Sequence, residues 1–179
     1  MKTMLLCFCF ATFLLSCNSG EQKTAATTST TDSTTKSTVD LPYTASYSSS
    51  WSTDVSDADL KMVLMSYKDW TDNNMSGLGN AMADTVEWEM SSGDDKKLSK
   101  ADLMKMFSTY RDSLSSVKID MTAWQKMYAT DKKEGYIVTW YDETDTYKTG
   151  KVDSASYHDI NQVKDGKIVW YAQYKRPKK

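Results

Sequence analysis

Residues 158–174 read HDINQVKDGKIVWYAQY, and this stretch decides the fold prediction. Apolar and polar residues alternate on both sides of Asp165-Gly166, a pair that is typical of tight β-hairpin turns. The pattern therefore predicts a long strand from about residue 151 to 163 and a second strand from 167 to 175. Because a tight turn joins them, the two strands should be antiparallel neighbours in one sheet.

The length of this turn decides which residue lies opposite Asp159. A two-residue turn would pair Asp159 with Ala172, whereas a three-residue bulged turn would pair it with Tyr171 or Gln173. The sequence leaves these registers open. In each of them His158, the single histidine of the chain, falls on the face opposite Asp159, because neighbouring side chains of a strand point to opposite faces.

The same alternation extends upstream of the hairpin. Residues 117–123 alternate between apolar and polar side chains, as in an antiparallel strand with one buried face. Residues 136–141, YIVTWY, are apolar on both faces and are typical of a central, covered strand. Turn-forming residues at 131–135 and 149–150 separate these segments. The second half of the chain therefore predicts four antiparallel strands joined by hairpins.

Helical spacing replaces this alternation nearer the N-terminus. Residues 56–59, SDAD, form a helix-capping pattern, and apolar residues then recur at helical spacing over residues 60–70. Asn73-Asn74 should end this helix, and a shorter helix is expected over residues 76–82. Two consecutive helices are therefore predicted before the first strand.

A strand and a third helix follow before the series of hairpins. Residues 86–90 alternate and predict the strand, and the polar segment 91–97 is expected to be a loop. Residues 99–102 form a second capping pattern, with apolar residues at helical spacing up to Tyr110. The order of helix, helix, strand, helix and four strands indicates the α+β class.

Two stretches and the order of elements resemble the nuclear transport factor 2-like superfamily, in its SnoaL-like branch. Residues 67–88, YKDWTDNNMSGLGNAMADTVEW, resemble the family's helix, loop, helix and "ADD"-type start of the first strand, and residues 158–174 resemble its closing hairpin. The resemblance covers about residues 59–174. It implies a cone in which a curved antiparallel sheet wraps around a long N-terminal helix, with a mostly apolar pocket at the open end.

The resemblance also assigns the catalytic positions of the ketosteroid isomerase branch to residues of this chain. The base falls on Met90, whose thioether cannot take a proton. Asp159 falls where isomerases carry a protonated aspartic acid and cyclases an acid/base aspartate, and Tyr67 lies within one residue of the donor tyrosine. Asp159 and Tyr67 are therefore the catalytic candidates. The alternative is that Asp159 is a hydrogen-bonded structural residue of a half-exposed strand.

Aromatic residues are expected on the elements that would surround the cone. Most should pack in the core, and some could line a pocket for a flat apolar or sugar-like ligand. The predicted pocket residues are Tyr67, Trp88, Trp140, Tyr157, Asp159 and Tyr171. Trp124 and Tyr128 lie on the more polar face of their predicted strand, so they are candidates for a homodimer contact through the convex face of the sheet.

Several kinds of site lack the residues they need. One histidine, with no cysteine beyond Cys17, cannot build a dedicated zinc site or the usual nucleophilic triads. The sequence has neither a Gly-rich phosphate loop nor a Gly-x-Ser-x-Gly elbow. A formal net charge of −2 without a basic face argues against nucleic acid as a partner. We therefore expect no metal, no cofactor and no nucleic acid.

The N-terminal residues resemble the signal of a bacterial lipoprotein. A positive start at Lys2 precedes the apolar run of residues 4–15, which is too short to span a membrane. Residues 14–17, LLSC, resemble the lipobox, which implies that Cys17 is acylated, palmitate being a typical acyl chain, and becomes the first residue of the mature chain. An ordinary signal peptide or a buried N-terminal helix is the alternative.

These patterns divide the chain into a signal peptide (1–16), an acylated cysteine with a disordered Ser/Thr-rich tether (17–50) and one domain (51–179), whose structure should begin near residue 54. The predicted location is the bacterial cell envelope, with the protein attached to the membrane through Cys17. The predicted function is binding of a small apolar ligand or an envelope protein. An isomerase-, dehydratase- or cyclase-like enzyme and a structural homodimer are the alternatives.

Overall fold

The computed structural model describes residues 40–178, and the helices and strands of this region follow the predicted order with two short strands in addition. The elements are β1 (Trp51–Ser52), α1 (Asp57–Thr71), α2 (Met75–Ala81), β2 (Met82–Glu89), β3 (Asp95–Ser99), α3 (Lys100–Arg111), β4 (Leu114–Ala129), β5 (Glu134–Tyr147), β6 (Val152–Lys164) and β7 (Lys167–Pro177). The predicted signal peptide, Cys17 and the tether up to residue 39 lie outside the described residues.

The helices begin where the capping patterns predicted. The side chain of Ser56 accepts a hydrogen bond from the backbone N–H of Asp59 at 3.0 Å, and Ser99 does the same for Asp102 at 3.1 Å. Asn74 caps α2 in the same way. Each cap satisfies a backbone donor that the first helical turn leaves without a partner, which fixes the start of the helix.

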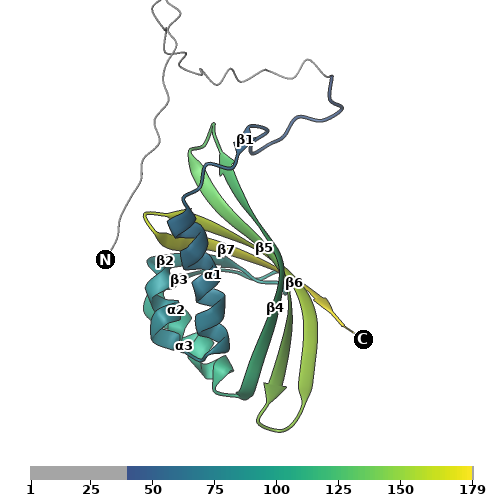
Figure 1. Cartoon of the computed structure of the whole chain (residues 1–179). Coiled ribbons are helices and arrows are strands. Elements are labelled where there is room, and N and C mark those ends of the chain that lie inside the picture. The colour runs from purple at the N-terminus through teal and green to yellow at the C-terminus, as the bar shows by residue number, and fades with distance from the viewer. Residues whose placement is uncertain (1–39, 179) are drawn as a thin grey trace, which may run out of the picture. The chain divides into compact units, whose positions relative to one another are not determined.

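The sheet confirms the predicted α+β cone. Its strand order is β1-β4-β5-β6-β7-β2-β3, and α1, α2 and α3 pack on one side of it, where the sheet curves around them (Figure 1). Apolar residues of the helices and of the concave face form a common core. One pair departs from the antiparallel prediction, because β2 runs parallel to β7. None of the helices within residues 40–178 is long and apolar enough to cross a membrane.

The hairpin between β6 and β7 has the two-residue turn, but not the pairing expected from it. Asp165 and Gly166 have φ angles of 52° and 69°, as a tight hairpin turn with two left-handed residues requires. A register shift close to this turn then adds one residue to β7. As a result Asp159 lies opposite Gln173 rather than Ala172.

A similar shift in β4 overturns the expected position of Trp124 and Tyr128. The alternation of β4 is interrupted between Met121 and Ala123, and beyond this bulge Trp124 pairs with the concave-face residue Thr139. One extra residue exchanges the two faces of a strand. Trp124 and Tyr128 therefore lie on the concave side, where Tyr128 packs against the core. They are not residues of the convex face.

Packed structure also begins earlier than residue 54. The hydroxyl of Tyr47 makes hydrogen bonds to Glu134 and, at 2.6 Å, to Tyr136, both at the start of β5. Trp51 packs edge-on against the ring of Tyr136. Residues of the predicted tether near Tyr47 are therefore attached to the sheet. The other difference is β3, an edge strand formed within the polar segment that the sequence predicted as a loop.

Candidate functional site

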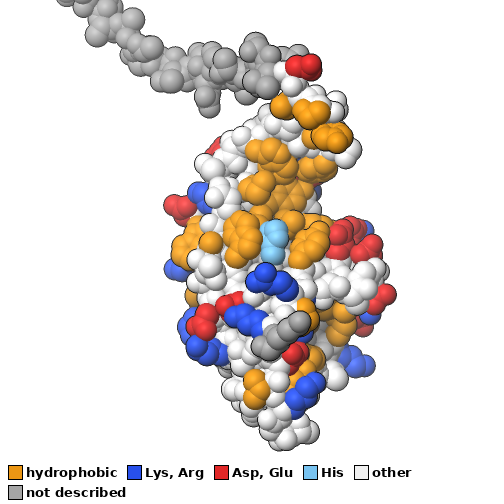
Figure 2. Space-filling view, turned by 90° about the vertical axis from the view of Figure 1, so that its right-hand side faces the viewer, with side chains coloured by type: hydrophobic (Ala, Val, Ile, Leu, Met, Phe, Trp, Pro, Cys, Tyr) orange, Lys and Arg blue, Asp and Glu red, His pale blue; other side chains and the backbone are white. Residues whose placement is uncertain are grey.

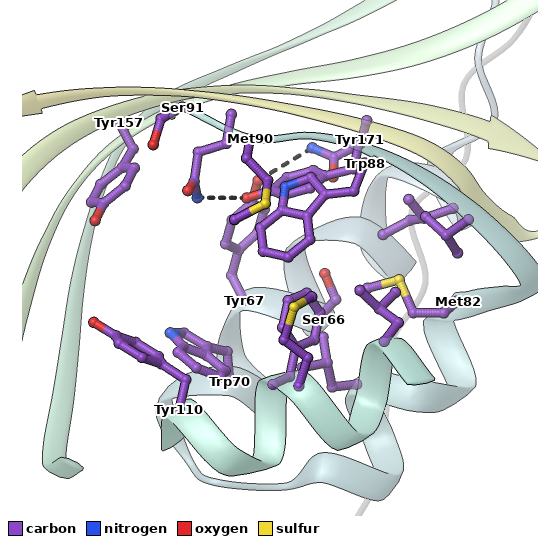
Figure 3. A pocket seen from close by; sticks show the side chains of 18 of the residues that line it. Ser66, Tyr67, Trp70, Met82, Trp88, Met90, Ser91, Tyr110, Tyr157 and Tyr171 are labelled. Atoms are coloured by element: carbon purple, nitrogen blue, oxygen red, sulfur yellow. Dashed lines mark hydrogen bonds between the residues drawn. The ribbon is translucent and has the colours of Figure 1, made fainter. Parts of the chain in front are cut away.

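A cavity of about 370 Å³ lies between the helices and the concave face of the sheet. Its walls are mostly aromatic and apolar side chains from α1, α3, β2 and the β5–β7 strands, as Figure 3 shows. A cavity of ~150 Å³ is large enough to hold benzene. The space is therefore sufficient for a small organic molecule with more atoms than a single ring.

Four of the six predicted pocket residues line this cavity. Tyr67, Trp88, Tyr157 and Tyr171 contribute to its wall from α1, β2, β6 and β7 (Figure 3). Trp140 and Asp159 are not part of the lining. The cone that the resemblance implied therefore does bring these residues from four elements to one cavity.

Trp140 lies on the convex face, so its assignment to the pocket was wrong. It follows Thr139 and precedes Tyr141, which both face inward, and strand alternation directs its own side chain outward. Its ring stacks on His158 with centroids 4.9 Å apart, and His158 in turn lies beside Tyr174. Figure 2 shows the histidine among hydrophobic side chains on this face.

Asp159 lies behind the cavity wall and is completely buried. Its Oδ2 accepts hydrogen bonds from the hydroxyls of Tyr67 at 3.0 Å, Tyr141 at 2.7 Å and Tyr171 at 2.8 Å. These tyrosines come from α1, β5 and β7, so one carboxylate oxygen connects the long helix to two strands. Its other oxygen, Oδ1, has no hydrogen-bond partner among residues 40–178.

Further polar side chains complete this buried network. The hydroxyl of Tyr67 also lies 2.8 Å from Thr139 Oγ1 and accepts a hydrogen bond from Asn161 Nδ2 at 3.2 Å. Gln173 Nε2 donates to the hydroxyl of Tyr171 at 2.8 Å. Because nearly every member has its partners, the network can stabilise the fold without any ligand.

The electrostatics of the network follow from its burial. Burial raises the pKa of Asp159 to about 6, and the hydrogen bonds from Tyr141, Tyr171 and Tyr67 oppose this rise. Burial also holds the pKa values of the three tyrosines well above the usual value, so their hydroxyls stay protonated and act as donors. At neutral pH Asp159 is therefore mostly an ionised acceptor with three neutral donors around one oxygen.

Glu143 is a second buried carboxyl, and the sequence analysis missed it. It lies on the same face of β5 as Tyr141, lines the cavity and is only 9 % exposed. Hydrogen bonding to the indole of Trp70 lowers its pKa, and its carboxyl also interacts with that of Asp145. Its position two residues after Tyr141 was the available signal, because alternate strand residues share a face.

The pKa of Glu143 is raised to about 8, first by burial and then by the charges of Asp145 and Asp159. Asp145, two residues further along β5, accepts a hydrogen bond from the hydroxyl of Tyr110 at 2.8 Å. Burial raises the pKa of Asp145 too. The β5 strand therefore presents two neighbouring inward carboxyls, and Glu143 is the one that lines the cavity.

The position of the isomerase base also opens into the cavity. Met90 lines it, directly after the end of β2 (Figure 3). Glu89 points to the other face, where it accepts a hydrogen bond from Trp170 Nε1 at 3.0 Å. A thioether therefore occupies the place where the resemblance to isomerases would put a proton acceptor.

Comparison with known proteins identifies the fold but no sequence relative. No protein-family model and no curated protein matches the chain. Among solved structures, an epoxide hydrolase of the LEH-like type from Mycobacterium tuberculosis superimposes with a TM-score of 0.57 and 8 % identity, over 66 % of this chain and 83 % of that one.

Two further structures are similar to the same region. A nuclear transport factor 2-like protein of unknown function from Burkholderia pseudomallei gives a TM-score of 0.55 and 12 % identity, over 68 % of this chain and 92 % of that one. A protein from Catenulispora acidiphila with the ketosteroid isomerase-like fold, in complex with trimethylamine, gives a TM-score of 0.53 and 13 % identity, over 64 % of this chain and 84 % of that one. The chain therefore has the nuclear transport factor 2-like fold.

Proposed function

We propose that this chain is a lipid-anchored protein of the bacterial envelope that binds a small organic molecule in its cavity. One observation carries the binding function. The cavity of about 370 Å³ has a mostly aromatic and apolar wall, and the position of the isomerase base in that wall is Met90. Such a cavity has the size and lining of a ligand site.

The position of Asp159 favours binding over the alternative in which Asp159 and Tyr67 perform acid/base chemistry. A catalytic acid must come within hydrogen-bonding distance of the reacting group. Asp159 is completely buried and is surrounded by three tyrosine hydroxyls, and it does not line the cavity. Its hydrogen bonds are those of a structural residue. Structural neighbours that include an epoxide hydrolase and a trimethylamine complex support a fold that holds small molecules.

Blocking the cavity tests the binding function. In the full-length protein, Met90→Trp should place an indole in the cavity, whereas Met65→Trp should add an indole on the exposed side of α1. Titration calorimetry with 2-naphthol and 3-tert-butylphenol should show saturable binding to the wild-type protein. Met90→Trp should weaken it at least about tenfold, a loss of ~1.4 kcal/mol, and Met65→Trp should leave it unchanged. Equal binding to both variants, or no saturable binding to the wild type, would contradict the proposal.

The anchor is tested separately at Cys17. The motif of residues 14–17, LLSC, supports acylation at that thiol. Cys17→Ser should abolish labelling with radioactive palmitate and release the protein from membranes, whereas Cys9→Ser, within the predicted signal peptide, should do neither. Labelled protein from the Cys17→Ser variant would show that the anchor is elsewhere.

A further inference from the structure

Glu143 differs from every other residue that lines the cavity. It is the only carboxyl among the described lining residues, and it is 9 % exposed. A buried carboxyl normally has hydrogen-bond donors or a charged partner, because leaving it without them is costly. Within residues 40–178 Glu143 forms no salt bridge, and the side chains that interact with its carboxyl are the neutral indole of Trp70 and the acidic Asp145. The missing positive charge is therefore expected in a ligand.

Aromatic rings lie around this carboxyl from both sides of the cavity. On the helix side, Trp70 and Tyr110 are stacked with centroids 6.1 Å apart. On the sheet side, Tyr141 and Tyr157 are stacked with centroids 5.2 Å apart. Figure 3 shows Trp70, Tyr110 and Tyr157 around the same end of the cavity. Rings that face a shared space can bind a cation through their negative faces.

The charges near this end of the cavity are predominantly negative. Glu143, Asp145 and Asp159 all belong to the concave face, and each of their charges affects the pKa of a neighbour. The one cationic side chain of the described lining, Lys175, already forms a salt bridge to Asp153 at 3.1 Å. Its ammonium also lies 5.6 Å from the centre of the Tyr157 ring. A cation is thus already accepted against one ring of this group.

We propose that the ligand of the cavity is an organic cation, a protonated amine or a methylated ammonium, bound by Glu143 among the rings of Trp70, Tyr110 and Tyr157. This inference rests on the proposed binding function and names the ligand class. An inorganic cation fits less well, because no group of three or more His, Cys, Asp or Glu side chains within residues 40–178 is arranged to hold a metal ion. Aromatic surroundings of this kind are also typical of sites that recognise methylated ammonium groups.

A second unsatisfied group indicates what the rest of the ligand carries. The indole Nε1–H of Trp88 is buried and has no acceptor among residues 40–178, and Trp88 lines the cavity. A buried donor without an acceptor is costly, and a ligand that supplies one gains affinity. The ligand should therefore combine a cationic group with an apolar part that bears a hydroxyl or carbonyl oxygen.

A pair of probes that differ only in charge tests this inference. The full-length protein is titrated by calorimetry at pH 8.5 with 3-(hydroxymethyl)phenyltrimethylammonium and with its neutral isostere 3-tert-butylbenzyl alcohol, whose hydroxyls do not ionise at this pH. The wild-type protein should bind the cation at least tenfold more tightly. Glu143→Gln should remove this preference and leave the affinity for the neutral alcohol within about threefold. Glu87→Gln, on the exposed face of β2, should preserve the preference.

The outcomes separate this inference from the proposed function. Equal or weaker binding of the cation to the wild-type protein would overturn the inference while leaving the binding function in place. A preference that survives in Glu143→Gln would also overturn it, because the selectivity would then come from another group. Binding of neither probe, nor of 2-naphthol, would reject the proposed function itself.

Discussion

Two buried carboxyls on the concave face of one sheet differ in what surrounds them. Asp159 accepts hydrogen bonds from three tyrosine hydroxyls behind the cavity wall, whereas Glu143 faces the cavity with no such partner. Burial is similar for both, so burial alone does not distinguish a structural carboxyl from a binding carboxyl. The difference lies in the donors: three tyrosine hydroxyls bond to Oδ2 of Asp159, whereas within residues 40–178 only the indole of Trp70 donates to Glu143. The four predictions below test this difference from the largest effect to the smallest.

The largest expected effect is the loss of stability when Asp159 is removed. Asp159→Ala leaves three buried hydroxyls without their acceptor, and each unsatisfied group costs ~1–3 kcal/mol. We expect the free energy of unfolding to fall by at least about 3 kcal/mol, measured by urea denaturation of the full-length protein at pH 7. Glu143→Ala removes only the interaction with the indole of Trp70 at the cavity wall and should cost less than about 1 kcal/mol. Similar losses for the two variants would show that satisfaction does not distinguish them.

The second prediction concerns how stability changes between pH 6 and pH 8. The folded-state pKa of Glu143 is about 8, above its usual value near 4.5, so its contribution to stability is complete below pH ~4.5 and is lost as pH rises to about 8. Asp159, with a pKa of about 6, loses its contribution at lower pH. The wild-type protein should therefore lose about 2 kcal/mol from pH 6 to pH 8 in urea denaturation.

Glu143→Gln serves as the test of that assignment, because it removes the titrating group and keeps the size of the side chain. Its stability should change much less over the same pH range, and at pH 8 it should exceed that of the wild type. The ionisable groups near Glu143 that could contribute are Asp145, Asp159, Tyr141, Tyr157 and Lys175. If the variant loses as much stability as the wild type, one of these groups is responsible instead.

The local patterns that fixed the hairpins were sufficient to predict most of the fold. These patterns depend only on residues that are neighbours in the chain. The structure has the tight turn at Asp165-Gly166 and the helix cap at Ser56, as predicted. A β-bulge, in contrast, has no such local signature in the amino-acid sequence. The bulge in β4 exchanged the faces of Trp124 and Tyr128, and the shift near the β6–β7 turn changed the partner of Asp159.

The candidate site was predicted only in part for a similar reason. Tyr67 and Tyr171 could be placed in the wall because the resemblance puts their helix and strand around the cone, and both line the cavity. Glu143 was missed, because a carboxyl in a strand normally predicts a solvent-facing position, and its burial depends on α1 and α3 packing over β5. The family resemblance directed attention to Asp159, which lies one layer behind the cavity.

The third prediction connects the pH dependence of Glu143 to the binding of a cation. A cationic ligand favours the ionised carboxylate, so binding below pH 8 must displace the proton of Glu143. The affinity for 3-(hydroxymethyl)phenyltrimethylammonium should rise about tenfold from pH 6.5 to pH 8.5, whereas that for 3-tert-butylbenzyl alcohol should stay constant. Calorimetry at pH 7 in buffers of different ionisation enthalpy should detect proton release. Affinity that does not change with pH, together with no released proton, would separate Glu143 from ligand binding.

The smallest expected effect comes from Lys175, the cation that lies beside the same cavity. Its charge repels a cationic ligand, but the salt bridge to Asp153 and partial exposure to water weaken that repulsion. Burial lowers the pKa of Lys175, while hydrogen bonds to Asp153 and Tyr157 outweigh this and leave the pKa raised, so the side chain is charged at pH 9. At that pH Glu143 is mostly ionised as well. Removing Lys175 takes away a charge that lowers the pKa of Glu143, and this opposes part of the effect on binding.

Lys175→Met should therefore strengthen binding of 3-(hydroxymethyl)phenyltrimethylammonium by only about two- to threefold, or ~0.5 kcal/mol, at pH 9. Lys118→Met, on the far strand β4, should have no effect. Weaker binding in Lys175→Met would mean that the ammonium helps to hold the ligand, and the cavity would then favour a molecule with an anionic or neutral group at this end.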